Sequence, residues 1–154
     1  MAVAVLHAVT AVAAFAAMAM SGVYGATARR LRRPGAAEEV RRFFAKPSSA
    51  DGAVLAVAPL GVTALLLDPH GAGLGQLWVW AAIVAWVVAS LVWFAVVRPA
   101  GKAIAQAAGR GDGEPTGPRA VAILRAQGRR LAYAGAITDV VFVVALGLMV
   151  FQPG

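Results

Sequence analysis

Uninterrupted apolar segments dominate the pattern of hydrophobic and polar positions along this chain. Four such segments stand out, covering residues 3–28, 53–67, 77–97 and 131–151. The last of them contains their only charged residue, Asp139. A helix needs about 20 mostly apolar residues to cross the hydrocarbon core of a bilayer. The pattern therefore predicts an all-α protein, a bundle of four transmembrane helices that forms a single transmembrane domain over residues 1–154.

The second segment is short for a crossing, and Pro59 and Gly61 interrupt it. Such a stretch is also typical of a re-entrant segment, which enters and leaves the membrane on the same side. The basic residues are Arg29, Arg30, Arg32, Arg33, Arg41, Arg42 and Lys46 after the first segment, and Arg98, Lys102, Arg110, Arg119, Arg125, Arg129 and Arg130 between the third and the fourth. A re-entrant second segment would place these two basic loops on opposite sides of the membrane. Because basic loops collect on the cytoplasmic side, the charges favour a full crossing.

The same charges predict the orientation. With four crossings, both basic loops lie in the cytoplasm and both termini lie outside, in a multi-pass protein of the inner (plasma) membrane. The arginines nearest the membrane are expected to bind anionic lipids of the cytoplasmic face, and they are Arg29, Arg30, Arg32, Arg33, Arg129 and Arg130. Topology thus accounts for the net charge of +7, so nucleic acid is not expected as a partner.

Helical patterns also occur outside the spans. In residues 36–46, Val40, Phe43 and Phe44 are spaced i, i+3, i+4, which is typical of the apolar face of a helix. We expect a short cytoplasmic amphipathic helix on the membrane surface, with its phenylalanines among the lipid headgroups. The third helix is expected to continue past its span, and the fourth to begin ahead of its span, near Pro118.

The amino-acid composition argues against a soluble domain and excludes several kinds of catalytic or metal site. The chain is 60% hydrophobic and 14% charged, whereas about half of the residues of a soluble domain are apolar and a quarter are charged. It has no cysteine, which excludes disulfides, thiolate metal sites and cysteine nucleophiles. We find no phosphate-binding glycine loop, zinc motif or pair of carboxylates. The sequence therefore favours a protein that is not an enzyme.

Asp139 is the one acid in a predicted span. A rise of about 1.5 Å per residue places it roughly 18 Å from the outer end of its helix, close to the middle of the bilayer. Gly128, Ala132 and Gly135 share its helical face, and a face of small residues packs against other helices. The carboxyl group is therefore expected to point into the bundle.

Two groups lie at a similar predicted depth: the Ser90 hydroxyl, and the Leu55 carbonyl that Pro59 deprives of its usual donor. Asp139, Ser90 and Leu55 are thus expected to form an intramembrane polar cluster. One hypothesis is a proton-titrating acid at the centre of a small transporter. The other is a neutral acid that joins helices, within the bundle or toward a partner subunit. A single acid without a second intramembrane charge favours the second hypothesis.

The two histidines raise a further hypothesis. His7 and His70 are predicted near the outer membrane face, with Thr10 and Thr63 at a similar depth. Two imidazoles are a minimal ligand set for haem or copper. These four residues are therefore candidates for ligand binding, and His7 is the candidate metal ligand. No complete cofactor motif is present, and interfacial hydrogen bonding is the alternative.

Short motifs give the chain a family resemblance. They are Leu6-His7, Gly61 within the segment 52–67, Trp78-Val79-Trp80, Arg98-Pro99 and the final Met149-Val150-Phe151-Gln152-Pro153-Gly154. In these the chain resembles a bacterial family of four-helix integral membrane proteins of unknown function, itself similar to parts of copper-resistance D proteins. The resemblance implies a four-helix protein of the inner membrane and no defined activity, and it implies a copper role by analogy alone.

These patterns favour a small polytopic membrane protein that acts through helix–helix contacts, as an oligomer or as an accessory subunit of a larger complex. Its expected partners are the lipid bilayer and other membrane subunits or further copies of itself. The alternatives are a proton-coupled transporter centred on Asp139 and a haem- or copper-binding membrane protein that uses His7.

Overall fold

The computed structural model describes residues 2–30, 36–45, 50–67, 75–108 and 118–151. In chain order the elements are α1 (Ala2–Arg30), α2 (Ala36–Ala45), α3 (Ala50–Leu66), α4 (Leu77–Val92), η1 (Trp93–Val97), α5 (Arg98–Ala108) and α6 (Pro118–Phe151). η1 is a stretch of π-helix. The all-α prediction is confirmed, because the described residues contain helices and no strand. The short helix after the first span and the early start of the last helix are confirmed as well.

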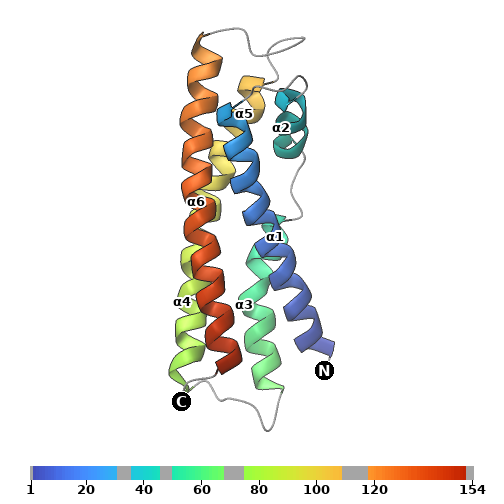
Figure 1. Ribbon diagram of the computed structural model, residues 1–154. Coiled ribbons are helices and arrows are strands. Elements are labelled where there is room, and N and C mark those ends of the chain that lie inside the picture. Colours follow the sequence, from blue (N-terminus) through green and yellow to red (C-terminus); the bar gives the residue numbers. More distant parts are fainter. Residues whose placement is uncertain (1, 31–35, 46–49, 68–74, 109–117, 152–154) are drawn as a thin grey trace.

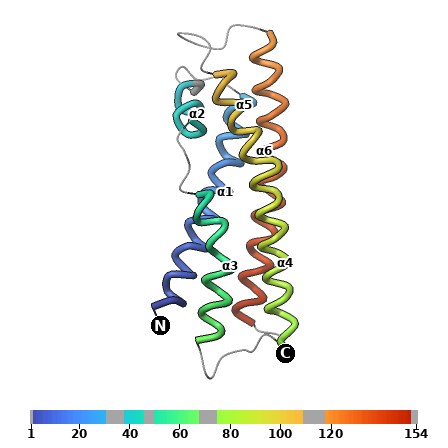
Figure 2. The backbone as a smooth tube through the Cα atoms, turned by 180° about the vertical axis from the view of Figure 1, so that it is seen from behind, coloured from blue at the N-terminus to red at the C-terminus, as the bar shows by residue number. Residues whose placement is uncertain are grey.

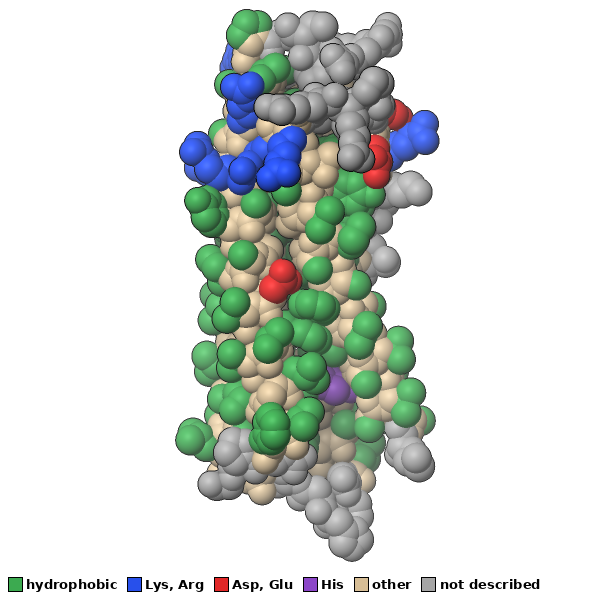
Figure 3. All heavy atoms as spheres, viewed as in Figure 1, with side chains coloured by type: hydrophobic (Ala, Val, Ile, Leu, Met, Phe, Trp, Pro, Cys, Tyr) green, Lys and Arg blue, Asp and Glu red, His purple; other side chains and the backbone are tan. Residues whose placement is uncertain are grey.

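The helices form an elongated bundle (Figure 1). α1 packs against α6 and α3, and α6 also packs against α4 and α5. α4, η1 and α5 follow one another as one long helix beside α6 (Figure 2). Both termini lie at the same end of the bundle, here called the terminal end (Figure 1). Lysine and arginine side chains gather toward the opposite end, here called the basic end (Figure 3).

Three helical stretches in the described residues are long and apolar enough to cross a membrane: Ala2–Arg30, Leu77–Ala108 and Pro118–Phe151. α3 has 17 residues, or about 26 Å at 1.5 Å per residue, slightly less than a hydrocarbon core of about 30 Å. It qualifies as part of a fourth span only together with α2, from which it is bent by 47°. The described residues therefore contain three candidate spans, or four if α3 crosses together with α2.

α1 and α6 approach each other closely because glycines line their contact. A methyl group added at Gly128 would lie 2.5 Å from the carbonyl oxygen of Gly25, and one added at Gly135 would lie 2.9 Å from the Cα of Gly22. Either contact would force the two backbones apart, since both methyl groups would meet main-chain atoms. The prediction that the small face of α6 packs against another helix is confirmed at these two positions.

The long helix widens just before Pro99. The amide of Arg98 donates to the carbonyl of Trp93, five residues earlier, as in a π-turn. Proline has no amide hydrogen, and its ring crowds the carbonyl four residues before it. The wider turn relieves this crowding, so the helix continues through Pro99 into α5. The hydrophobic pattern predicts a continuous helix here and gives no sign of the π-turn.

The predicted contact of the α2 phenylalanines with lipid headgroups is wrong, because the apolar face of α2 packs on the protein. Val40 is fully buried, and Phe43 stacks on Tyr24 of α1 with ring centroids 4.1 Å apart. Phe44 lies over Gly101 of α5, where an added methyl group would be 2.6 Å from the ring. α1 and α5 thus give α2 an apolar surface on which to bury these side chains.

Candidate functional site

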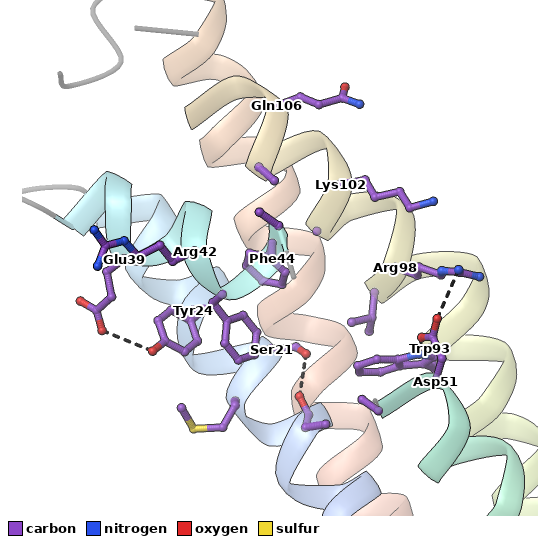
Figure 4. A pocket seen from close by; sticks show the side chains of 18 of the residues that line it. Ser21, Tyr24, Glu39, Arg42, Phe44, Asp51, Trp93, Arg98, Lys102 and Gln106 are labelled. Carbon is purple, nitrogen blue, oxygen red and sulfur yellow. Dashed lines mark hydrogen bonds and ion pairs between the residues drawn. The ribbon is translucent and has the colours of Figure 1, made fainter. Parts of the chain in front are cut away.

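A large cavity lies beside α2 toward the basic end, and we call it the basic-end cavity (Figure 4). Its volume is about 1170 Å³. α1, α2, the start of α3, η1 and α5 all contribute to its wall. Apolar residues such as Ala16, Met20 and Val97 line part of it, and charged residues of α2, α3 and α5 line the rest. The cavity therefore offers apolar and charged surface to the same ligand.

Asp51 joins three elements at this cavity (Figure 4). Its Oδ1 accepts a hydrogen bond from the Trp93 indole at 2.7 Å, and its Oδ2 lies 3.2 Å from Nη2 of Arg98. Asp51 is in the first turn of α3, where the positive end of the helix dipole also favours a carboxylate. Since Trp93 and Arg98 flank the π-turn, the turn that accommodates Pro99 also positions both partners of Asp51.

The hydrophobic pattern and the motifs of the sequence do not single out this trio as a site. The sequence feature that could have indicated the trio is an isolated acid directly before one apolar segment and an isolated arginine directly after another. Asp51 precedes the second segment and Arg98 follows the third, so a full-crossing topology places both at the same membrane boundary. Opposite charges at one boundary of two antiparallel spans are a reason to test for an ion pair.

The α2 side of the cavity carries its own ion pairs. Glu38 accepts from Nε of Arg41 at 2.6 Å and from Nε of Arg42 at 2.7 Å. These hydrogen bonds from the two guanidinium groups lower the pKa of Glu38 from 4.5 to about 2. The neighbouring Glu39 accepts a hydrogen bond of 3.3 Å from the Tyr24 hydroxyl. α2 is therefore held to α1 by a polar contact as well as by its aromatic rings.

α5 contributes a row of polar side chains to the cavity wall. Arg98, Lys102 and Gln106 are spaced four residues apart and project to the same side of α5 (Figure 4). Arg98 pairs with Asp51. Within the described part of the chain, Lys102 makes neither an ion pair nor a hydrogen bond. Its ammonium group is thus available to an anion.

A second, apolar cavity of about 240 Å³ lies among α1, α3, α4 and α6. Near it, two side chains bond to main-chain carbonyls of α3. Nδ1 of His7 is 2.8 Å from the Val57 carbonyl oxygen, and the Trp86 indole donates to the Val54 carbonyl at 2.7 Å. The imidazole lies against Gly61, where an added methyl group would be 2.8 Å from the ring. His7 and Trp86 thus join α3 to α1 and α4.

The predicted cluster of Asp139, Ser90 and Leu55 does not form through hydrogen bonds. Ser90 Oγ and Asp139 Oδ1 are both buried, and neither has a hydrogen-bond partner. Leu55, on α3, is 51% exposed. Asp139 instead continues the face of α6 that carries Gly135, and Gly135 packs on Gly22 of α1. The expected bond is missing because the glycine contacts direct this face toward α1, whereas Ser90 belongs to α4.

The other predicted site residues are placed as follows. Thr10 and Thr63 each donate a hydrogen bond of 2.7 Å to a carbonyl of their own helix, those of Leu6 and Pro59. His70 lies outside the described residues, and within them no group of three His, Cys, Asp or Glu side chains is arranged to hold a metal. Among the predicted lipid-binding arginines, Arg29, Arg30, Arg129 and Arg130 are exposed, and Arg32 and Arg33 lie outside the described residues.

Comparison with known protein families matches residues 1–153 to a family described as predicted integral membrane protein (DUF2269). No curated protein and no solved structure matches the chain. The resemblance to copper-resistance D proteins therefore stays a prediction. The match covers almost the entire chain and agrees with its apolar helical spans. The chain belongs to the DUF2269 family of predicted integral membrane proteins.

Proposed function

We propose that this integral membrane protein acts through contacts between helices in the bilayer, as a self-associating unit or as an accessory subunit of a larger complex. The observation that carries the proposal is the environment of the Asp139 carboxyl group. Its Oδ1 is buried without a hydrogen-bond partner. A carboxyl group in an apolar environment is strongly destabilising unless a partner satisfies it. Asp139 as a whole is partly exposed, and we propose that a helix from another subunit contacts the accessible part of its carboxyl group.

The surroundings of Asp139 support this interpretation. One turn away, Gly135 packs against Gly22, and on the other side Phe142 stacks on Phe15 with ring centroids 4.0 Å apart. The nearby hydroxyl of Thr138 already donates to the carbonyl of Ala134 at 2.8 Å. Asp139 is thus partly exposed, at the edge of the α1–α6 contact, with no donor supplied by these neighbours. A second protein can reach it there.

Charge supports the proposed orientation in the inner membrane. The described arginines and Lys102 belong to α2, α5 and the basic-end portions of α1 and α6, and loops rich in such residues remain in the cytoplasm. The basic end is then cytoplasmic and both termini are outside. This orientation requires α3 to cross as the fourth span. A locally thinner bilayer or snorkelling of its flanking residues accommodates its 17 residues.

Purification in mild detergent tests the proposal. The wild-type protein is expected to elute with a second copy or a partner subunit, and Asp139→Leu is expected to dissociate that complex. Asp139→Asn should retain most of it, because an amide still forms interhelical hydrogen bonds. Ser90→Ala is the matched control, since it removes another buried group without a partner. A wild-type protein that is monomeric and free of partners would contradict the proposal.

The transporter alternative gives a different result with the same variants. Asp139→Asn would then assemble normally and lose a pH-dependent flux in proteoliposomes. Asp139 does not line either of the two cavities described here, which favours the contact role. For haem at His7, the adjacent cavity of 240 Å³ is smaller than the roughly 300–1,000 Å³ of typical small-molecule sites. The small volume favours the contact role over the haem alternative.

A further inference from the structure

We propose that the basic-end cavity binds an anionic phospholipid, with Lys102 as the main cation for the lipid phosphate. This inference goes beyond the proposed function, because it concerns another part of the molecule and does not involve Asp139. Three properties of the cavity carry it: the balance of charge in its wall, the spacing of donors on α5, and its position and size.

The balance of charge identifies the free cation. The cavity wall contains three basic residues, Arg42, Arg98 and Lys102, and three acids, Glu38, Glu39 and Asp51. Glu38 compensates Arg42 at 2.7 Å, and Asp51 compensates Arg98 at 3.2 Å. The remaining acid, Glu39, belongs to α2, whereas Lys102 projects from the side of α5 that faces away from α2 (Figure 4). Among the described residues Lys102 therefore presents a positive charge without an ion-pair partner, and an anionic headgroup can fill that role.

The spacing of donors on α5 suits a phosphate group. Arg98, Lys102 and Gln106 form a row at intervals of four residues, which places them about 6 Å apart along the helix. A guanidinium has five N–H donors, and Nη2 of Arg98 lies 3.2 Å from Asp51 Oδ2. The Gln106 amide adds two further donors. Around the Lys102 ammonium, these groups offer hydrogen bonds to several phosphate oxygens.

Position and size favour a phospholipid over a soluble phosphate. The cavity lies toward the basic end, between apolar residues of α1 and charged residues of α2, α3 and α5, and basic residues at the end of a span lie at the level of lipid headgroups. Ala16, Ala17 and Met20 of α1 supply an apolar wall along which an acyl chain can lie. The volume of about 1170 Å³ exceeds that of a typical small-molecule site, so it accommodates a headgroup together with part of a chain.

Native mass spectrometry of the purified full-length protein tests the inference. Phosphatidylglycerol and phosphatidylcholine with the same acyl chains are titrated as probes. Wild type is expected to retain phosphatidylglycerol in preference to phosphatidylcholine. Lys102→Gln should weaken that binding about fivefold, the factor that corresponds to the roughly 1 kcal/mol contributed by one basic residue at an anionic surface. Ala16→Phe should weaken binding of the acyl chain by filling the apolar side of the cavity.

Arg125→Gln is the matched control, because it removes one exposed positive charge of α6 that does not line the cavity. It should bind phosphatidylglycerol as wild type does. Equal weakening in Lys102→Gln and Arg125→Gln would overturn the inference in favour of general attraction to the basic end. Equal retention of phosphatidylcholine would also overturn it. Displacement of phosphatidylglycerol by millimolar inorganic phosphate would instead assign the site to a soluble anion.

Discussion

At the scale of single residues, glycines shape this protein by letting neighbouring helices and side chains come close together. Gly128 and Gly135 let α6 contact α1. Gly101 leaves room for the ring of Phe44, and Gly61 leaves room for the imidazole of His7. In a bilayer, helices gain little from the hydrophobic effect when they associate, so dispersion and hydrogen bonds at short distance supply much of the attraction. Each of these glycines thus decides whether one particular helix pair or side-chain contact forms.

Gly128→Ala is expected to destabilise the bundle by about 1–3 kcal/mol, as for other overpacked interiors, because the new methyl group would lie 2.5 Å from the Gly25 carbonyl oxygen. Unfolding in detergent micelles measures the effect. The control is Gly147→Ala on the same helix, where nothing lies within 4 Å of the added group, so better helix propensity leaves it neutral or stabilising. Equal melting temperatures for the two variants would show that the α1–α6 contact is looser than described.

His7→Ala is expected to lower stability by about 2 kcal/mol, through the lost hydrogen bond to Val57 and the space left at Gly61. Thr10→Ala is the control, because Thr10 bonds within its own helix and should change little. The same purified proteins test the metal hypothesis. A Soret band or stoichiometric copper in wild type that His7→Ala removes would establish a metal site at this residue.

At the scale of elements, α2 and η1 shape the basic-end cavity. α2 is held by its aromatic contacts with Tyr24 and by the packing of Phe44 on Gly101. The π-turn of η1 positions Trp93 and Arg98 on Asp51. α2 lies outside the apolar segments and η1 forms the last residues of the segment 77–97, and both determine which charged groups face the cavity.

The ion pairs of α2 predict a dependence on pH. Because Arg41 and Arg42 lower the pKa of Glu38 from 4.5 to about 2, their stabilisation of α2 is complete above pH 4.5 and is lost as pH falls toward 2. Hydrogen exchange of the α2 amides between pH 5 and pH 2 measures this loss. Glu38→Gln should reduce the pH dependence, whereas Glu39→Gln, which lacks an arginine partner, should keep it. The same pH dependence in wild type and Glu38→Gln would disprove the assignment.

The whole molecule is polarised along its long axis. Apolar surface covers most of its length, the basic side chains gather toward one end, and both termini lie at the other (Figures 1 and 3). Such a distribution fixes how a protein sits in a membrane, because moving the basic end through hydrocarbon would desolvate several charges together.

Cysteine accessibility tests this placement, and the natural absence of cysteine makes single-cysteine variants straightforward. In sealed cells, an impermeant maleimide should label Phe151→Cys and Leu66→Cys and should leave Arg125→Cys unlabelled until the membrane is opened. Labelling of Phe151→Cys without Leu66→Cys would show that α3 does not cross. Labelling of Arg125→Cys in intact cells would reverse the orientation.

Much of the fold follows from local patterns. The apolar segments predict α1, α4 and α6 as spans, and the spacing of Val40, Phe43 and Phe44 predicts α2. The small face of α6 predicts its packing on another helix. These predictions succeed because helix formation in lipid depends on the hydrogen bonding and hydropathy of each segment by itself.

The sites depended on the tertiary structure. The sequence marks Asp139, Ser90 and His7 as polar residues within apolar spans. It does not show how each helix is rotated relative to its neighbours. The prediction from sequence therefore pairs Asp139 with Ser90 and places Phe44 against lipid. The glycine contacts set those rotations, and they separate Asp139 from Ser90 and bring His7 to Val57. Asp51, Trp93 and Arg98 meet through a π-turn that hydropathy does not encode. The sequence alone thus determined which segments are helical and apolar, and the packing of backbones at short distance decided which polar groups meet.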